Sequence, residues 1–176
     1  SGGRLNFSIK YFKDKSAEKI AEEQGKEGYN TPNSNLVSSG VHEAAHALER
    51  FFFESNKKFY IENKPARELD ASYGWKKNLE AKPIVLEACK IVRKTPYGKG
   101  KTNKQLISSI SEYADDNYGD TLAEAFADVY DNGEKANPLS IEIRRLAKEK
   151  YLKYRKKVGW EKRNNSFSRM DNYYAL

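Results

Sequence analysis

The chain has 176 residues, with 32 Lys and Arg against 25 Asp and Glu, and a net charge of +7. This length fits a single domain, and its twelve Tyr, eight Phe and two Trp supply aromatic surface that disordered chains lack. No apolar run approaches the roughly 20 residues of a membrane span. The single cysteine, Cys89, excludes a disulfide framework and a cysteine-built zinc site, and its apolar helical surroundings predict a buried thiol.

Apolar and polar residues alternate over 5–11, which predicts a half-buried strand. Residues 25–35 are rich in Gly, Pro and Asn and indicate a loop, whereas 57–73 fit no single pattern. Apolar periodicity and helix-start signals predict helices at about 16–24, 38–54, from 83 onward, 104–114, 120–131 and 138–157.

These elements predict an α+β fold: one predominantly helical domain over residues 1–176 with a small N-terminal sheet. Residues 1–3 are typical of a cloning remnant, and 164–176 are expected to form a loose tail. The first residues contain no apolar stretch, so we expect no signal peptide.

Basic residues gather in the C-terminal third, interleaved with Tyr151, Tyr154 and Trp160. Such a segment could contact the phosphates of a nucleic acid. Glutamates such as Glu142 and Glu149 supply counter-charges within it, so a solvated helix face is the favoured interpretation.

The two histidines of the chain, His42 and His46, stand four residues apart in a His-Glu-x-x-His motif. On a helix this spacing projects both imidazoles from one face, where they can bind one Zn²⁺. Glu43 would lie beside the metal and could take a proton from its bound water. Two surface histidines one turn apart would be the non-functional interpretation, but this arrangement arises by chance in only about one chain in a thousand.

A catalytic zinc needs a third protein ligand, and without a third histidine that ligand must be a carboxylate. Asp120, Glu124 and Asp128 are spaced by four residues and share a helix face. Asp120 could bind the metal with Glu124 supporting a ligating histidine, or Glu124 could bind it with Asp128 in support. Glu124 could instead close a capping box with Thr121.

The segment Ser111-Glu112-Tyr113, followed by Asn117 and by 120–126 (Asp-Thr-Leu-Ala-Glu-Ala-Phe), resembles the zinc peptidases related to anthrax lethal factor. That grouping includes clostridial Pro-Pro endopeptidases and domains of phage minor head proteins and mobile-element proteins. The resemblance also takes in the 42–46 motif, the end of the 5–11 strand and residues 132–140. Together these blocks cover about half the chain.

The resemblance implies a zinc metalloendopeptidase in which His42 and His46 bind zinc and Glu43 is the general base. It places Tyr113 at the developing oxyanion, although the spacing from Leu106 and Ile110 would equally suit a core tyrosine. The position of the family's third ligand, a glutamate, is occupied here by Asp120, which is one methylene shorter. Its spacing of seven residues from Tyr113 favours Asp120 as the ligand, with Glu124 as the supporting carboxylate.

We therefore expect a zinc-dependent endopeptidase that binds one Zn²⁺ and a protein or peptide substrate. The strand Leu5–Tyr11 is a candidate edge to which an extended substrate could add. An alternative is a phage or mobile-element structural domain that keeps the zinc site and binds a partner without turnover. A third is a basic DNA-contacting module with a structural zinc. The resemblance suggests a virion-associated protein or a toxin exported from a Gram-positive bacterium.

Overall fold

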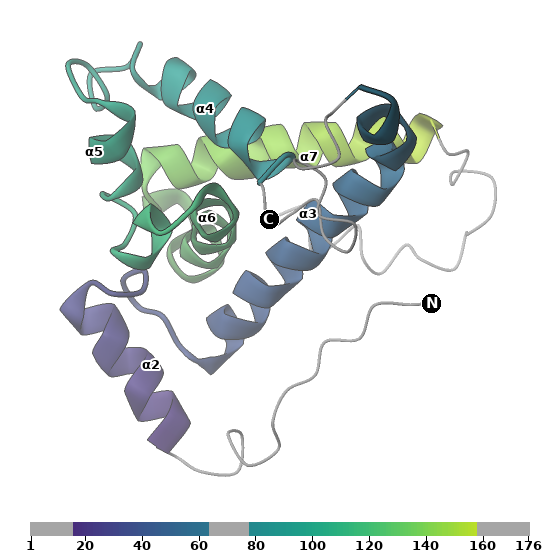
Figure 1. Cartoon of the computed structure of the whole chain (residues 1–176). Coiled ribbons are helices and arrows are strands. Elements are labelled where there is room, and N and C mark those ends of the chain that lie inside the picture. Colours follow the sequence, from purple (N-terminus) through teal and green to yellow (C-terminus); the bar gives the residue numbers. More distant parts are fainter. Residues whose placement is uncertain (1–15, 64–77, 158–176) are drawn as a thin grey trace.

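A computed structural model of the chain describes residues 16–63 and 78–157 (Figure 1). Its helices are α2 (Ser16–Glu27), α3 (Leu36–Asn63), α4 (Ala81–Val92), α5 (Asn103–Ile107), α6 (Tyr118–Asn132) and α7 (Pro138–Lys157). Two 3-10 turns, η3 (Tyr113–Asp115) and η4 (Gly133–Lys135), lie on either side of α6.

Helix α6 is the centre of the domain, because it packs against α3, α4 and α7. In Figure 1 it is seen nearly end-on in the middle of the molecule, with α3 passing beside it. The apolar side chains that these helices share form one core. Its fully buried members include Phe52, Leu106, Leu122, Leu139 and Ile143.

The first turns of α6 and α7 are set by asparagine caps. The Asn117 Oδ1 accepts hydrogen bonds from the backbone N–H groups of Gly119 and Asp120, at 2.9 and 3.1 Å. Asn137 Oδ1 accepts from Leu139 N at 2.9 Å, and Pro138 occupies the first helical position. The prediction of a helix over 138–157 is confirmed, and the capping box with Thr121 is wrong because Asn117 caps this helix.

The prediction of an α+β fold with a small sheet is wrong. The described residues are 76% helical, and 16–63 and 78–157 contain no strand. A strand needs a neighbouring extended segment to satisfy its backbone groups, and this part of the chain supplies helices and loops. The predicted strand at 5–11, with the proposed substrate edge Leu5–Tyr11, lies outside the described residues.

The prediction of one helix over 104–114 is also wrong, since α5 ends at Ile107. The hydroxyl of Ser108 donates to the carbonyl of Lys104 at 2.9 Å, so the serine competes for a helical acceptor. Farther on, the Tyr113 N–H donates to the carbonyl of Tyr29 at 2.9 Å instead of continuing a helix. The chain is thereby redirected toward the loop that follows α2.

A buried polar cluster fastens the second half of α3 to the rest of the domain. The Glu80 carboxylate, 1% exposed, accepts hydrogen bonds from Tyr60 and Asn56 at 2.7 Å each and pairs with Lys150. This cluster joins α3, α4 and α7, because its members come from all three or from their ends.

Cys89 is buried as predicted, and burial raises the pKa of its thiol. No helix within 16–63 and 78–157 is both long and apolar enough to cross a membrane.

Candidate metal centre

The two histidines project from the same face of α3 toward α6. Their Nε2 atoms lie 3.1 Å apart, and their rings meet edge to face. His42 is 7% exposed, while His46 is half-buried. The helix presents this face inward because Ala45, Glu49 and Phe52 are buried along it.

Asp120 enters the same space from the first turn of α6. Its Oδ1 lies 3.3 Å from His46 Nε2 and 4.0 Å from His42 Nε2. Its other oxygen, Oδ2, accepts a hydrogen bond from the Asn117 side chain. Asn117 therefore both begins α6 and orients the Asp120 carboxylate, with Oδ1 turned to the histidines.

His42, His46 and Asp120 could hold a metal ion, because one ligand atom from each lies within 4.8 Å of the other two. Zinc bonds of 2.0–2.1 Å in a tetrahedron would place ligand atoms about 3.3 Å apart. The three separations, 3.1, 3.3 and 4.0 Å, lie around this value. The donor set therefore fits a small cation after shifts of well under 1 Å.

Glu124 lies one turn beyond Asp120 and binds the far side of His42. Its Oε1 accepts a hydrogen bond from His42 Nδ1 at 2.8 Å. Its Oε2 accepts from Ser111 Oγ at 2.8 Å and from the Thr31 N–H at 3.2 Å. With the proton held on Nδ1, the Nε2 lone pair is free to face a metal. Of the two alternatives for the third ligand, this geometry corresponds to the one in which Asp120 faces the histidine pair and Glu124 supports His42.

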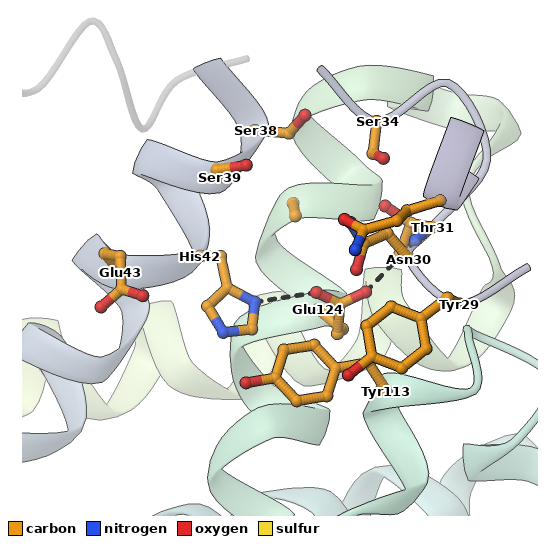
Figure 2. Close-up of a pocket in the computed structure, with 12 residues that line it drawn as sticks. Tyr29, Asn30, Thr31, Ser34, Ser38, Ser39, His42, Glu43, Tyr113 and Glu124 are labelled. Atoms are coloured by element: carbon orange, nitrogen blue, oxygen red, sulfur yellow. Dashed lines mark hydrogen bonds and ion pairs between the residues drawn. The ribbon is translucent and has the colours of Figure 1, made fainter. Parts of the chain in front are cut away.

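Three aromatic rings form a continuous stack at the edge of this cluster (Figure 2). The ring of Tyr113 lies parallel to that of His42, with centroids 5.4 Å apart, and its other face stacks on Tyr29 at 5.4 Å. Burial, with the negative charge of Asp120 second, raises the pKa of Tyr113 to about 12. The phenol hydroxyl therefore keeps its proton at neutral pH and remains a hydrogen-bond donor.

Glu43 is exposed, in contrast to the buried carboxylates of Asp120 and Glu124. It lines a cavity together with His42 and Tyr113, which brings the three side chains to one opening. Asp128 does not join them: its carboxylate accepts from Asn132 Nδ2 at 2.8 Å and from Asn137 N at 2.9 Å. These bonds fix the C-terminal end of α6.

The charge around His46 favours its protonated form when no metal is bound. Burial lowers the pKa of His46, but the hydrogen bond and charge of Asp120, with the charges of Glu43 and Glu49, raise it above its usual value overall. Glu49 itself is fully buried, and its Oε1 accepts from the Ala81 N–H at 3.1 Å. Burial raises the pKa of Glu49 to about 7.

Sequence reasoning missed two parts of this site. The first is Glu49, which follows His46 by three residues on the same helix face and is buried. It lies outside the His-Glu-x-x-His motif, so the motif did not point to it. The loop carrying Tyr29 and Thr31 was predicted only as a loop. Its approach depends on contacts between segments more than 80 residues apart, of which the Thr31–Glu124 hydrogen bond is one, and no local pattern encodes them.

Comparisons of the chain with protein-family models, curated proteins and solved structures found no match. The function is therefore inferred from the geometry of this site.

Proposed function

We propose that the chain is a zinc-dependent endopeptidase. One observation carries the proposal: His42, His46 and Asp120 converge at metal-ligand separations while Glu124 binds the outer nitrogen of His42. Imidazole and carboxylate donors suit zinc, and a carboxylate behind a ligating histidine is the usual support of a zinc site.

Three ligands favour a catalytic site over a structural one, because structural zinc sites use four protein ligands. Within 16–63 and 78–157 the cluster contains three. Zinc bound there would polarise a peptide carbonyl and activate a water molecule. Peptide hydrolysis also needs a proton carrier and a hydrogen-bond donor for the oxyanion, and side chains of this protein would supply both.

Glu43 would act as the proton carrier. Its carboxylate is exposed at the cavity, next in sequence to His42, where it can accept a proton from the attacking water and deliver it to the leaving amine. Tyr113 would donate a hydrogen bond to the oxyanion, since its raised pKa keeps the hydroxyl protonated. Its stacking on His42 holds the phenol close to the ligands.

The test combines a metal assay with cleavage profiling of a peptide library on one preparation. We expect about one zinc per chain in wild-type protein, and metal-dependent cleavage. Glu43→Gln should keep the zinc and the fold but lose turnover by about 10²–10⁴-fold, because only the proton carrier is removed. Glu54→Gln, an exposed glutamate on the same helix, is the matched control and should behave as wild type.

Protein that contains no zinc and gains none on addition would contradict the proposal. Zinc binding without cleavage of any peptide would instead support the partner-binding alternative.

A further inference from the structure

A cavity of about 300 Å³ opens beside the candidate metal centre. Figure 2 shows its wall, with His42 and Glu43 from α3 on one side and residues 29–31 on the other. Its volume is sufficient for one amino-acid side chain, and Glu43 and Tyr113 lie at its lining. A side chain next to a scissile bond at the metal would therefore have this space within reach.

The wall of the cavity is polar and contains no lysine or arginine. Apart from His42, Glu43, Tyr113 and Glu124, its lining is Gln24, Tyr29, Asn30, Thr31, Ser34, Ser38, Ser39 and Ala127. Ala127 alone among these lacks a polar side-chain atom. Such a wall suits a ligand that forms hydrogen bonds, and burying it against a hydrocarbon side chain would leave polar groups unpaired.

Two of the wall groups use a donor inside the protein and can still accept a hydrogen bond. Ser34 Oγ donates to the carbonyl of Ala21 at 3.0 Å, and Asn30 Nδ2 donates to Gln24 Oε1 at 3.1 Å. Their side-chain oxygens, Ser34 Oγ and Asn30 Oδ1, therefore remain as acceptors for a ligand in the cavity. An acceptor-rich wall selects a ligand with N–H or O–H donors.

The wall offers little to a charged ligand. The Glu124 carboxylate already accepts from His42, Ser111 and Thr31, so its charge is largely compensated by donors of the protein. Glu43 is exposed at the opening, where water screens its attraction for an ammonium group. An acidic side chain would be repelled by Glu124 and Glu43 with no Lys or Arg in the lining, and a lysine would lose its hydration for little attraction in return.

The wall is also fastened to the groups that would perform the chemistry. The backbone N–H groups of Glu112 and Tyr113 donate to the carbonyls of Gly28 and Tyr29, at 2.9 Å each, and the Thr31 N–H binds Glu124. The loop is thus held at fixed distance from His42 and Tyr113, which is the preorganisation that a specificity site requires.

We infer that this cavity is the subsite for a substrate side chain next to the scissile bond, and that it selects an uncharged amide side chain, Gln or Asn. The inference rests on the proposed function. The amide supplies two N–H donors to the acceptor-rich wall and a carbonyl for donors such as the Gln24 amide or the Tyr29 hydroxyl.

The test uses peptides that differ only in one residue beside the cleaved bond: Gln, Asn, Leu, Glu or Lys. We expect kcat/KM for the Gln or Asn peptide to exceed that for the Leu, Glu and Lys peptides by about tenfold or more, because unpaired polar groups in the wall penalise the misfits. Binding of the same peptides to zinc-loaded Glu43→Gln protein, followed by calorimetry, should show the same order.

Ser39→Val removes an exposed hydroxyl from the rim of the cavity while keeping the side chain small. It should lower the ratio of Gln to Leu cleavage by about 2–10-fold, as expected for one hydrogen bond. Ser55→Val, an exposed serine elsewhere on α3, is the matched control and should leave the ratio unchanged.

Cleavage with no preference, or with a preference for Leu, Glu or Lys, would overturn the inference and leave the proposed endopeptidase standing. If no peptide is cleaved, the proposed function fails. In that case the subsite is supported only if the protein binds the Gln peptide selectively and Ser39→Val weakens this binding. If the Gln peptide is not bound selectively, the subsite is overturned as well.

Discussion

His42 Nδ1 and Glu124 Oε1 lie 2.8 Å apart, and this hydrogen bond joins α3 to α6 at the candidate metal centre. Because a single carboxylate also binds Ser111 and the loop residue Thr31, it positions the histidine, the turn before η3 and the cavity wall together. The neighbouring carboxylate, Asp120, faces the Nε2 atoms of both histidines. We therefore expect the two acids, one turn apart, to affect metal binding differently.

Replacing Asp120 by Ala should abolish stoichiometric zinc binding, because one of three protein ligands is removed. Glu124→Ala should retain zinc with an affinity lowered by about 10–100-fold, the usual cost of losing a hydrogen-bond partner of a ligating histidine. Zinc titration with a competing chelator measures both. Asp116→Ala, an exposed acid just before α6, should leave the affinity unchanged. Loss of metal in Glu124→Ala with retention in Asp120→Ala would assign the ligand to Glu124.

Tyr113→Phe removes the hydroxyl while keeping the ring that stacks on His42. We expect kcat to fall by about 10²–10³-fold, as for the loss of one oxyanion donor, with zinc affinity little changed. Tyr130→Phe, an exposed tyrosine on α6 that is absent from the cavity lining, is the matched control. An equal loss in both variants, or a loss of zinc in Tyr113→Phe, would mean that the tyrosine acts only by packing.

Acidification should release the metal at a higher pH than an ordinary histidine site would. The pKa of His46 in the metal-free protein is raised, and zinc binds only the neutral imidazole, so protons compete up to that raised value. Below the pKa of His46, the zinc dissociation constant should rise about tenfold for each pH unit, because one proton must leave this imidazole before zinc binds. Chelator competition between pH 5 and 8 tests this, and a dissociation constant that begins to rise only below the ordinary pKa of histidine would contradict it.

Glu49 should reduce the stability of the metal-free protein above neutral pH. Its folded-state pKa of about 7 exceeds the ordinary value of 4.5, so the native state binds a proton that the unfolded chain has lost, and stability falls as the pH rises through this interval. Glu49→Gln should therefore be more stable than wild type at pH 8, by up to about 3 kcal/mol.

Urea unfolding at pH 5 and pH 8, with chelator present, measures this difference, which should shrink toward pH 5. Glu54→Gln, an exposed change on the same helix, should show no such pH dependence. A Glu49→Gln variant that is destabilised equally at both pH values would show that the buried charge does not limit the stability of the metal-free protein.

The sequence predicted those parts of the molecule that local signals determine. The helix over 138–157 has an asparagine cap, a first-turn proline and a continuous periodic face, and its bounds are as predicted. The helix of the histidine motif was predicted to end near 54 but continues to Asn63, because Phe53 and Tyr60 stack on each other and Tyr60 binds Glu80. That continuation depends on tertiary contacts that periodicity alone does not report.

The error at 104–114 comes from competition between a local pattern and distant partners. The alternation that predicted a strand lies at 5–11, outside the described residues, which themselves contain no strand. The 104–114 segment has helical periodicity, but Asn137 binds the carbonyl of Ser109 at 2.7 Å and so takes the acceptor that a continuing helix would offer to Tyr113. The candidate histidine ligands, His42 and His46, were predictable because residue type and spacing alone specify their chemistry. The choice of Asp120 over Glu124 depended on the family resemblance.

Gly119 leaves room for the side chains that gather at the start of α6. A Cβ at this position would lie 2.9 Å from Asn78 Oδ1, 3.0 Å from Asn117 Oδ1 and 3.2 Å from Glu49 Oε2. A larger residue would therefore have to displace Asn117, which caps the helix and also binds Oδ2 of Asp120. A substitution at 119 should thus disturb the orientation of the Asp120 carboxylate without touching any candidate metal ligand.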